Sequence, residues 1–163
     1  MSVIRSKRLT RTLSGAIAVV GLSLVTLAAA PAAQASGTGA TCPVGRFCLY
    51  FNSNQQGARA DLVLTDAAFN NELFNDGPVG ANGWKVLLGN NAASYWNRTG
   101  TEIIVFDGTS CTFGAAGRAI GILPGKKENL PDDLKNRISS MKVTTPTDGY
   151  PGCSDYNPDQ SKY

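Results

Sequence analysis

The chain contains no histidine among its 163 residues. Histidine is the commonest general base and a frequent zinc ligand, so its absence excludes Ser-His-Asp triads, Cys-His dyads and His-ligated zinc sites. A phosphate-binding loop is missing too, because no Lys-Ser or Lys-Thr pair follows Gly114 and Gly117. A hydrolase with two carboxylates remains as a class, although the adjacent Asp132 and Asp133 suit a solvated turn better. We therefore predict that the protein is not an enzyme.

The first 35 residues have the features of a secretory signal peptide. Basic residues are concentrated between positions 5 and 11, residues 13–30 are mostly apolar, and Ala33-Gln34-Ala35 is an A-x-A cleavage site. The apolar run reaches the minimum of about 18 residues that a membrane span needs, but a cleavage site follows it directly. We predict that residues 1–35 are a signal peptide, that the protein is secreted and extracellular, and that its mature form has no membrane partner.

The mature chain has too little positive charge for a nucleic-acid partner. Without residues 1–35 it keeps 11 basic and 12 acidic residues, and so a net charge of −1. The basic pair Lys126 and Lys127 is followed at once by the acidic residues Glu128, Asp132 and Asp133. Binding to the phosphate backbone needs a basic patch or stripe, so we predict no nucleic-acid partner.

Four cysteines follow the predicted signal peptide, and their even number in an exported chain predicts two disulfides. Four cysteines allow three pairings. Cys42 and Cys48 flank a short turn, which favours a local bridge between them, and Cys111–Cys153 then follows by elimination. The second bridge would fix the C-terminal end of the chain to the fold.

The mature chain has the length of a single domain. Residues 36–145 contain the strand-like segments and are predicted to form this domain. Residues 146–163 are polar and are interrupted by Pro146, Pro151 and Pro158, so they read as a tail tethered by Cys153. We expect the protein to be a monomer.

Two stretches of the chain follow the same plan. Each has a β-type apolar run that ends in an aromatic residue, then a turn glycine with a second strand, and finally a polar Asn-x-x-Ser corner. A unit of this kind cannot bury its apolar face alone, so two should pack face to face. The sequence therefore predicts an all-β fold, a two-motif β-sandwich. Its parts are residues 47–51, 57–64 and 90–95 in the first motif, and 103–106, 117–123 and 135–140 in the second.

The remaining segments add shorter elements to this sandwich. Further strands are predicted at residues 84–88, 93–98 and 138–143 from their apolar and aromatic content. A short helix is predicted at residues 66–73, with its first residue as the cap, and a helical turn at residues 131–134. We expect most aromatic residues to belong to the core and corners, namely Phe47, Tyr50, Phe51, Tyr95, Trp96 and Phe106.

The start of the first motif carries a resemblance to a known family. The run Cys42-Pro43-x-Gly45-x-x-Cys48-Leu49-Tyr50, followed by the two motifs, resembles the secreted actinobacterial peptidase inhibitor family I36. The resemblance covers residues 42–143. It implies the Greek-key sandwich of the βγ-crystallins as the fold. It also implies a secreted metalloprotease as the partner, and inhibition of that protease as the function.

The two polar corners resemble the calcium-binding corners of βγ-crystallins, with departures. The first corner ends in Tyr95, and the second opens with Lys135, which would repel a cation. Calcium takes about six to eight oxygen ligands, and these corners offer only neutral side-chain oxygens, so any site would be weak. The alternative is that these side chains hydrogen-bond the corner backbone and hold the fold. No cofactor is predicted beyond weak calcium binding, for which the candidate ligands are Asn90, Asn91, Ser94, Asn136, Ser139 and Ser140.

The segment at residues 107–114 is the candidate inhibitory loop. It joins two predicted strands and contains a disulfide cysteine, two glycines and an aromatic residue. A rigid loop loses less entropy on entering a protease cleft than a flexible one. The family resemblance implies a thermolysin-like target, which cleaves on the amino side of bulky apolar residues. Phe113 is therefore predicted to enter the primary pocket, with Cys111 and Thr112 leading to it. The alternative is an ordinary hairpin in which Phe113 packs inward.

Two functional hypotheses follow from these observations. The leading one is a secreted inhibitor of thermolysin-like metalloproteases that acts through a rigid, substrate-like loop. The alternative is a secreted βγ-crystallin-like module that binds Ca²⁺ or a cell-surface partner, or acts as a toxin, without inhibitory activity. Titration of the protein into a protease assay distinguishes the two.

Overall fold

The computed structural model describes residues 41–144 and Cys153. The predicted signal peptide and all of the predicted tail except Cys153 lie outside these residues. Among the residues that are described, no helix has the length and apolar character needed to cross a membrane. The fold described below therefore belongs to the predicted inhibitor domain.

The first sheet contains four antiparallel strands in the order β2-β1-β3-β6. A short 3-10 turn, η1 (Ser53–Gln55), joins β1 to β2. The chain then makes a long connection and returns as β3, which lies beside β1. A strand that returns in this way gives the Greek-key connectivity. The strands are β1 (Phe47–Asn52), β2 (Gln56–Leu62), β3 (Ser94–Asn97) and β6 (Lys127–Asn129).

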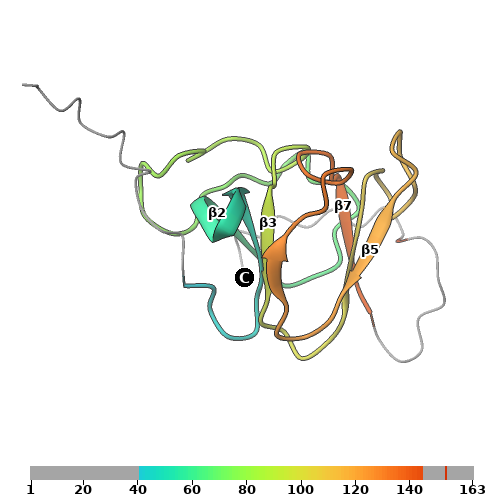
Figure 1. Cartoon of the computed structure of the whole chain (residues 1–163), viewed down its shortest axis with the longest axis horizontal. Coiled ribbons are helices and arrows are strands. Elements are labelled where there is room, and N and C mark those ends of the chain that lie inside the picture. Colours follow the sequence, from blue (N-terminus) through green and yellow to red (C-terminus); the bar gives the residue numbers. More distant parts are fainter. Residues whose placement is uncertain (1–40, 145–152, 154–163) are drawn as a thin grey trace, which may run out of the picture. The chain divides into compact units, whose positions relative to one another are not determined.

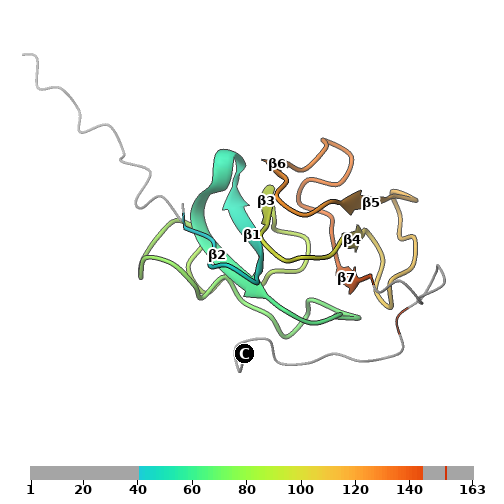
Figure 2. The same cartoon turned by 90° about the horizontal axis from the view of Figure 1, so that it is seen from below.

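The second sheet repeats this plan with three antiparallel strands in the order β5-β4-β7. β4 (Ile103–Phe106) continues through a long loop into β5 (Ala119–Ile122), and β7 (Ser140–Val143) returns beside β4. In Figure 1, β2 and β3 of the first sheet lie to the left of β5 and β7 of the second. Figure 2 separates the two groups of strands more clearly. The predicted all-β, two-motif sandwich is confirmed.

Each half of the chain also contributes to the sheet of the other half. β6 comes from the second half but pairs with β3 in the first sheet. In return, Asp66 from the first half bridges Met141 of β7 through two backbone hydrogen bonds of 2.9 Å. The two halves therefore cannot separate without breaking backbone hydrogen bonds. β6 was not predicted, because all three of its residues are exposed and it lacks the apolar alternation of a strand.

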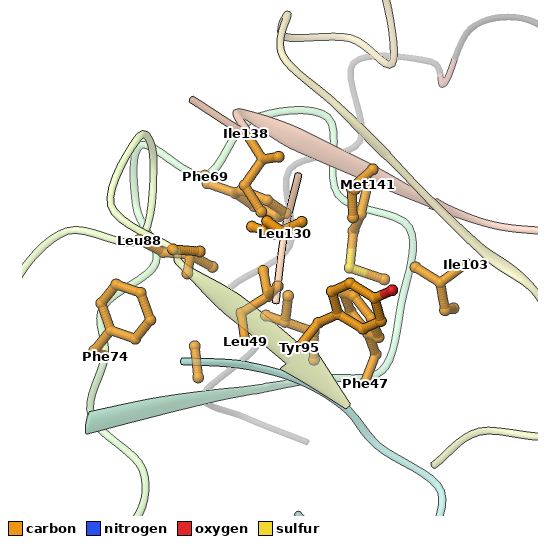
Figure 3. Close-up of a cluster of buried hydrophobic side chains, with 14 of the residues drawn as sticks. Phe47, Leu49, Phe69, Phe74, Leu88, Tyr95, Ile103, Leu130, Ile138 and Met141 are labelled. Carbon is orange, nitrogen blue, oxygen red and sulfur yellow. The ribbon is translucent and has the colours of Figure 1, made fainter. Parts of the chain in front are cut away.

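The core lies between the two sheets. Alternate residues of β1, Phe47 and Leu49, point into it together with Tyr95 of β3, and they meet Ile103 of β4 and Met141 of β7. Figure 3 shows these side chains converging. All five are buried, which is the pattern expected for strands with one face turned to a core. Four of the six aromatic residues predicted for the core and corners are buried. Phe51 is partly buried and packs on this core, and Trp96 is partly buried and packs on a smaller, separate cluster.

The long connection between β2 and β3 covers one end of this core with Phe69, Phe74 and Leu88. The helix predicted at residues 66–73 and the strand predicted at residues 84–88 are wrong, because the segment consists of turns and isolated bridges. Asp66 must be extended to pair with Met141, and its side chain accepts a hydrogen bond from Ala68 N in a local turn instead of capping a helix.

The structure contains both predicted disulfides. Cys42 pairs with Cys48, with their Cα atoms 5.8 Å apart, and Cys111 pairs with Cys153 at 5.2 Å. No free cysteine is present among the described residues. The first bridge closes the turn before β1, and the second joins the loop after β4 to the C-terminal end of the chain.

Candidate functional site

The loop between β4 and β5, residues 107–118, holds the predicted inhibitory residues. It leads into β5 as the gold segment of Figure 2. Its first part copies the η1 hairpin of the first motif. In each hairpin two consecutive residues have positive φ, Asn54 and Gln55 in the first and Ser110 and Cys111 in the second. The two turns thus bend the chain in the same way before their paths diverge.

One buried serine from the opposite corner clamps each hairpin. Ser94 Oγ accepts a hydrogen bond from Gln55 N at 3.0 Å and donates one to Asn52 O at 2.6 Å. The second motif has the same arrangement around the hydroxyl of Ser140, which is also fully buried. Its Oγ accepts from Cys111 N at 3.1 Å and donates to the carbonyl of residue 108 at 2.6 Å. Both hydroxyls, which the sequence offered as calcium ligands, are engaged in holding the hairpins.

The other corner residues also bond within the protein. The Asn91 amide donates to Leu87 O and to Gly89 O at 3.0 and 2.9 Å. Ser139 Oγ lies 3.2 Å from Asn90 Oδ1. These contacts agree with a structural role for the corners, and calcium binding there stays a prediction.

The two corners are also hydrogen-bonded to each other. Asn136 N donates to Ala92 O at 2.8 Å, and Asn90 N donates to Ile138 O at 2.9 Å. Both asparagines have positive φ. Within the described part of the chain, no group of three or more His, Cys, Asp or Glu side chains is arranged to hold a metal ion.

Phe113 lies on the part of the loop that has no counterpart in the first motif. Its side chain is 56% exposed, and its ring meets Phe106 edge-on with 6.5 Å between centroids. Thr112 beside it is exposed, whereas Cys111 is fully buried. The three predicted inhibitory residues therefore run from a buried anchor outward to an exposed aromatic side chain.

Asp107 holds the far side of the loop from within. Its Oδ1 accepts hydrogen bonds from Gly114 N at 2.7 Å and Arg118 N at 3.0 Å, and its Oδ2 accepts one from Ala116 N at 2.5 Å. Burial alone would raise the pKa of this carboxyl, but the backbone donors around it outweigh burial and lower the pKa below its usual value. Asp107 is therefore an ionised carboxylate at neutral pH.

The near side of the loop is held by the second disulfide and by the body of the domain. Ser110 N donates to Ala67 O at 2.6 Å, and Cys153 N donates to Ser110 O at 3.3 Å. Cys111 is bonded to Cys153 and to the Ser140 clamp. The backbone on both sides of Phe113 is thus fixed.

Two glycines permit the tight path of the loop. A Cβ atom at Gly114 would lie 2.5 Å from Asp107 O, and one at Gly108 would lie 2.6 Å from Thr112 O. Both distances are shorter than a van der Waals contact, and both oxygens belong to the backbone and cannot rotate away. No larger residue fits at either position without moving the loop.

The model of peptidase inhibitor family I36 matches residues 35–119, just over half of the chain. This chain belongs to peptidase inhibitor family I36. The matched segment includes the first motif, β4 and the whole loop. Membership places this I36 protein among peptidase inhibitors and not among enzymes, as predicted from its missing histidine. A search of curated proteins found no match.

Several solved structures are similar to this I36 protein. One, from work on the evolution of the eye lens βγ-crystallin domain fold, is 22% identical with a TM-score of 0.49 and covers 64% of this chain and 91% of its own. A βγ-crystallin from Ciona intestinalis is 21% identical with a TM-score of 0.43, covering 61% of this chain and 100% of its own. A βγ-crystallin domain from Flavobacterium johnsoniae is 17% identical with a TM-score of 0.45, covering 63% and 98%.

Sequence reasoning missed Asp107 and the clamping role of Ser140. Asp107 stands before a glycine at the end of an apolar run, where an aspartate commonly caps its own turn. That signal was available, but it does not say that the carboxylate reaches Arg118 N, eleven residues further on. Ser140 was singled out for its oxygen, as a calcium ligand or as a hydrogen-bonding group that holds the fold. Its hydrogen bond with Cys111 N was not foreseen, because the distance between the two residues cannot be read from the sequence.

Proposed function

We propose that this I36 family member is secreted and inhibits thermolysin-like metalloproteases through the loop at residues 107–118. Phe113 enters the primary pocket of the protease, exposed Thr112 occupies the cleft before it, and buried Cys111 leads to them as the anchor of the loop. The observation that carries this proposal is an exposed aromatic side chain on a backbone that is fixed on both sides.

A fixed loop favours inhibition over simple hydrolysis for two physical reasons. First, ordering a loop on binding costs free energy, and a loop that is already ordered avoids most of that cost. Second, after cleavage the two new ends would stay tied to the domain, by Cys111 on one side and by Asp107 on the other. Product release is slow when both halves remain in place. An exposed aromatic residue is also the type of side chain that dominates binding energy at interfaces.

The two disulfides support secretion. Disulfides form and persist in oxidising compartments and are rare in a reducing cytosol. Three of the four bridged cysteines are fully buried, namely Cys42, Cys48 and Cys111. An extracellular location would also bring the protein together with secreted metalloproteases.

The test is a titration of purified residues 36–163 into an assay of a thermolysin-like protease. We expect a fall in protease activity that reaches completion near one inhibitor per enzyme. A serine protease of the trypsin type serves as the control and should keep its activity, because its primary pocket selects basic side chains and not an aromatic ring. An unchanged metalloprotease rate at micromolar protein would overturn the proposed target.

A further inference from the structure

The part of the loop that follows Phe113 has no core of its own. Phe113, Ala115 and Gly117 are exposed, and none of residues 112–118 is buried. A hollow of about 170 Å³ separates this segment from the polar corner, between Ala116 on one side and Arg137 on the other. Apolar packing therefore cannot be what fixes the backbone here, because burying apolar surface is what stabilises an ordinary loop.

Hydrogen bonds to the carboxylate of Asp107 fix this segment instead of apolar packing. It lies on the wall of the hollow and receives the three backbone N–H groups of Gly114, Ala116 and Arg118. Hydrogen bonds to an ionised acceptor are roughly twice as strong as those between neutral groups. Asp107 as a whole residue is 8% exposed, so most of it is shielded from water.

The hydrogen-bond donors to the Asp107 carboxylate are backbone groups, and the guanidinium of the nearby Arg118 is directed elsewhere. Arg118 turns its guanidinium away to Asp133, with 3.0 Å between Nε and Oδ2, and both side chains are about half exposed. Arg137 lines the opposite wall of the hollow and is exposed. The hydrogen bonds between the Asp107 carboxylate and the loop backbone therefore fix both the side chain and the loop.

We propose that Asp107 is the positioning residue of the inhibitory loop, and that its replacement turns the protein from an inhibitor into a substrate. This proposal rests on the proposed function. Asp107 does not touch the protease and acts through the backbone of residues 114–118. Without its carboxylate the segment after Phe113 is free to move. A protease can then hydrolyse the Thr112–Phe113 bond, adding water's hydroxyl to the Thr112 carbonyl and its proton to the Phe113 nitrogen, and release the new end.

The test uses Asp107→Ala and Asp107→Asn in residues 36–163, with Asp133→Asn as the control. Asp133→Asn removes the exposed ion pair between Asp133 and Arg118 of the same loop, and an exposed pair contributes little to stability. Asparagine keeps one acceptor oxygen, so its effect should lie between that of alanine and wild type. Three quantities are measured: the hydrogen-exchange rates of the Gly114, Ala116 and Arg118 amides, the inhibition constant, and the rate of cleavage before Phe113.

We expect Asp107→Ala to exchange the three amides at least tenfold faster, to raise the inhibition constant at least tenfold and to be cleaved in the loop. Strand amides should keep their protection, and Asp133→Asn should behave as wild type. If wild type inhibits and Asp107→Ala inhibits equally without being cleaved, the positioning role is overturned and the proposed function stands. If wild type fails to inhibit while Asp107→Ala still frees the three amides, the proposed function fails and the hold of Asp107 on the loop stands.

Discussion

The two hairpins of this protein begin alike and end differently. Each has two residues of positive φ and a buried serine clamp. After the clamp the first hairpin returns at once to β2, and the long connection covers it, with Ala58 N bonded to Asn82 O at 2.8 Å. The second hairpin instead extends as an exposed loop that is held by a carboxylate and a disulfide. The same motif thus forms a short, covered turn in the first hairpin and an exposed loop, residues 107–118, in the second.

The largest expected difference between the two hairpins is the stability that each neighbouring disulfide contributes. In the chain-entropy model, removing Cys111–Cys153 should cost about 4 kcal/mol of stability and removing Cys42–Cys48 about 2 kcal/mol, because the bridged residues are 42 and 6 apart in sequence. Paired alanine substitutions and denaturant unfolding measure both values. We expect protease inhibition to fall with the second bridge and to persist without the first. A larger cost for Cys42–Cys48 would contradict the comparison.

The serine clamps should be equal for stability but unequal for function. Ser94→Ala and Ser140→Ala each leave a buried donor and acceptor unpaired, which costs about 1–3 kcal/mol. Both variants should therefore show a similar fall in melting temperature. Ser140→Ala should also weaken inhibition, since its clamp holds Cys111 in the loop, whereas Ser94→Ala should inhibit as wild type at a temperature where both are folded. Equal inhibition by the two variants would remove the link between clamp and loop.

Gly114 tests how tightly the displayed loop is built. Gly114→Ala would place a Cβ atom 2.5 Å from Asp107 O and force the backbone beside Phe113 to move. We expect at least a tenfold loss of inhibition, about 1.4 kcal/mol, with a modest change in melting temperature. Gly100→Ala is the matched control, because its Cβ atom would meet nothing within 4 Å. Wild-type inhibition by Gly114→Ala would mean that the loop tolerates a different path.

The two hairpins should also differ in their response to acid. The carboxyl of Asp107 has a lowered pKa, so its contribution to loop stability is complete above the unfolded value of about 3.9 and is lost as the pH falls through the folded value. The first hairpin has no carboxylate in residues 52–57. Arg137 lines the same hollow as Asp107, whereas the guanidinium of Arg118 is paired with Asp133.

Amide chemical shifts recorded between pH 5 and pH 2 give the measurement. The Gly114 and Ala116 amides should shift with a midpoint below about 3.9, and the amides of the η1 hairpin should not follow that titration. The control is Asp107→Asn, in which the transition should disappear. A midpoint above the ordinary aspartate value would show that burial, not hydrogen bonding, dominates at Asp107.

Calcium should have the smallest effect. The corner oxygens of Ser94 and Ser140 already bond the hairpins, so millimolar Ca²⁺ should leave the melting temperature unchanged. A ligand at 100 times its dissociation constant would stabilise by about 2.7 kcal/mol, which a melt resolves. A rise of several degrees that Asn91→Ala or Asn136→Ala abolishes would instead support a calcium-binding module.

Local patterns predicted the strands and the disulfides but not the long-range pairings. The strands β1 and β4 were found because their sequences are continuous apolar runs, which suits strands that are buried on both faces. β6 was missed because its exposed residues form a strand only through pairing with β3. The segment after β2 was assigned a helix because its pairing partner, Met141, lies far along the chain. Phe113 was singled out by its residue type, whereas the hold of Asp107 on its loop depends on contacts that no local pattern encodes.

The central claim is that the second hairpin displays Phe113 to a protease, and one pair of variants tests it most directly. Phe113→Ala and Leu123→Ala remove side chains of nearly equal exposure, 56% and 55%. Melting and inhibition of a thermolysin-like protease are measured for both. We predict melting temperatures close to wild type for both variants, and a loss of inhibition of about 2 kcal/mol or more, roughly 30-fold, for Phe113→Ala alone. A large fall in stability with unchanged inhibition for Phe113→Ala would contradict the claim.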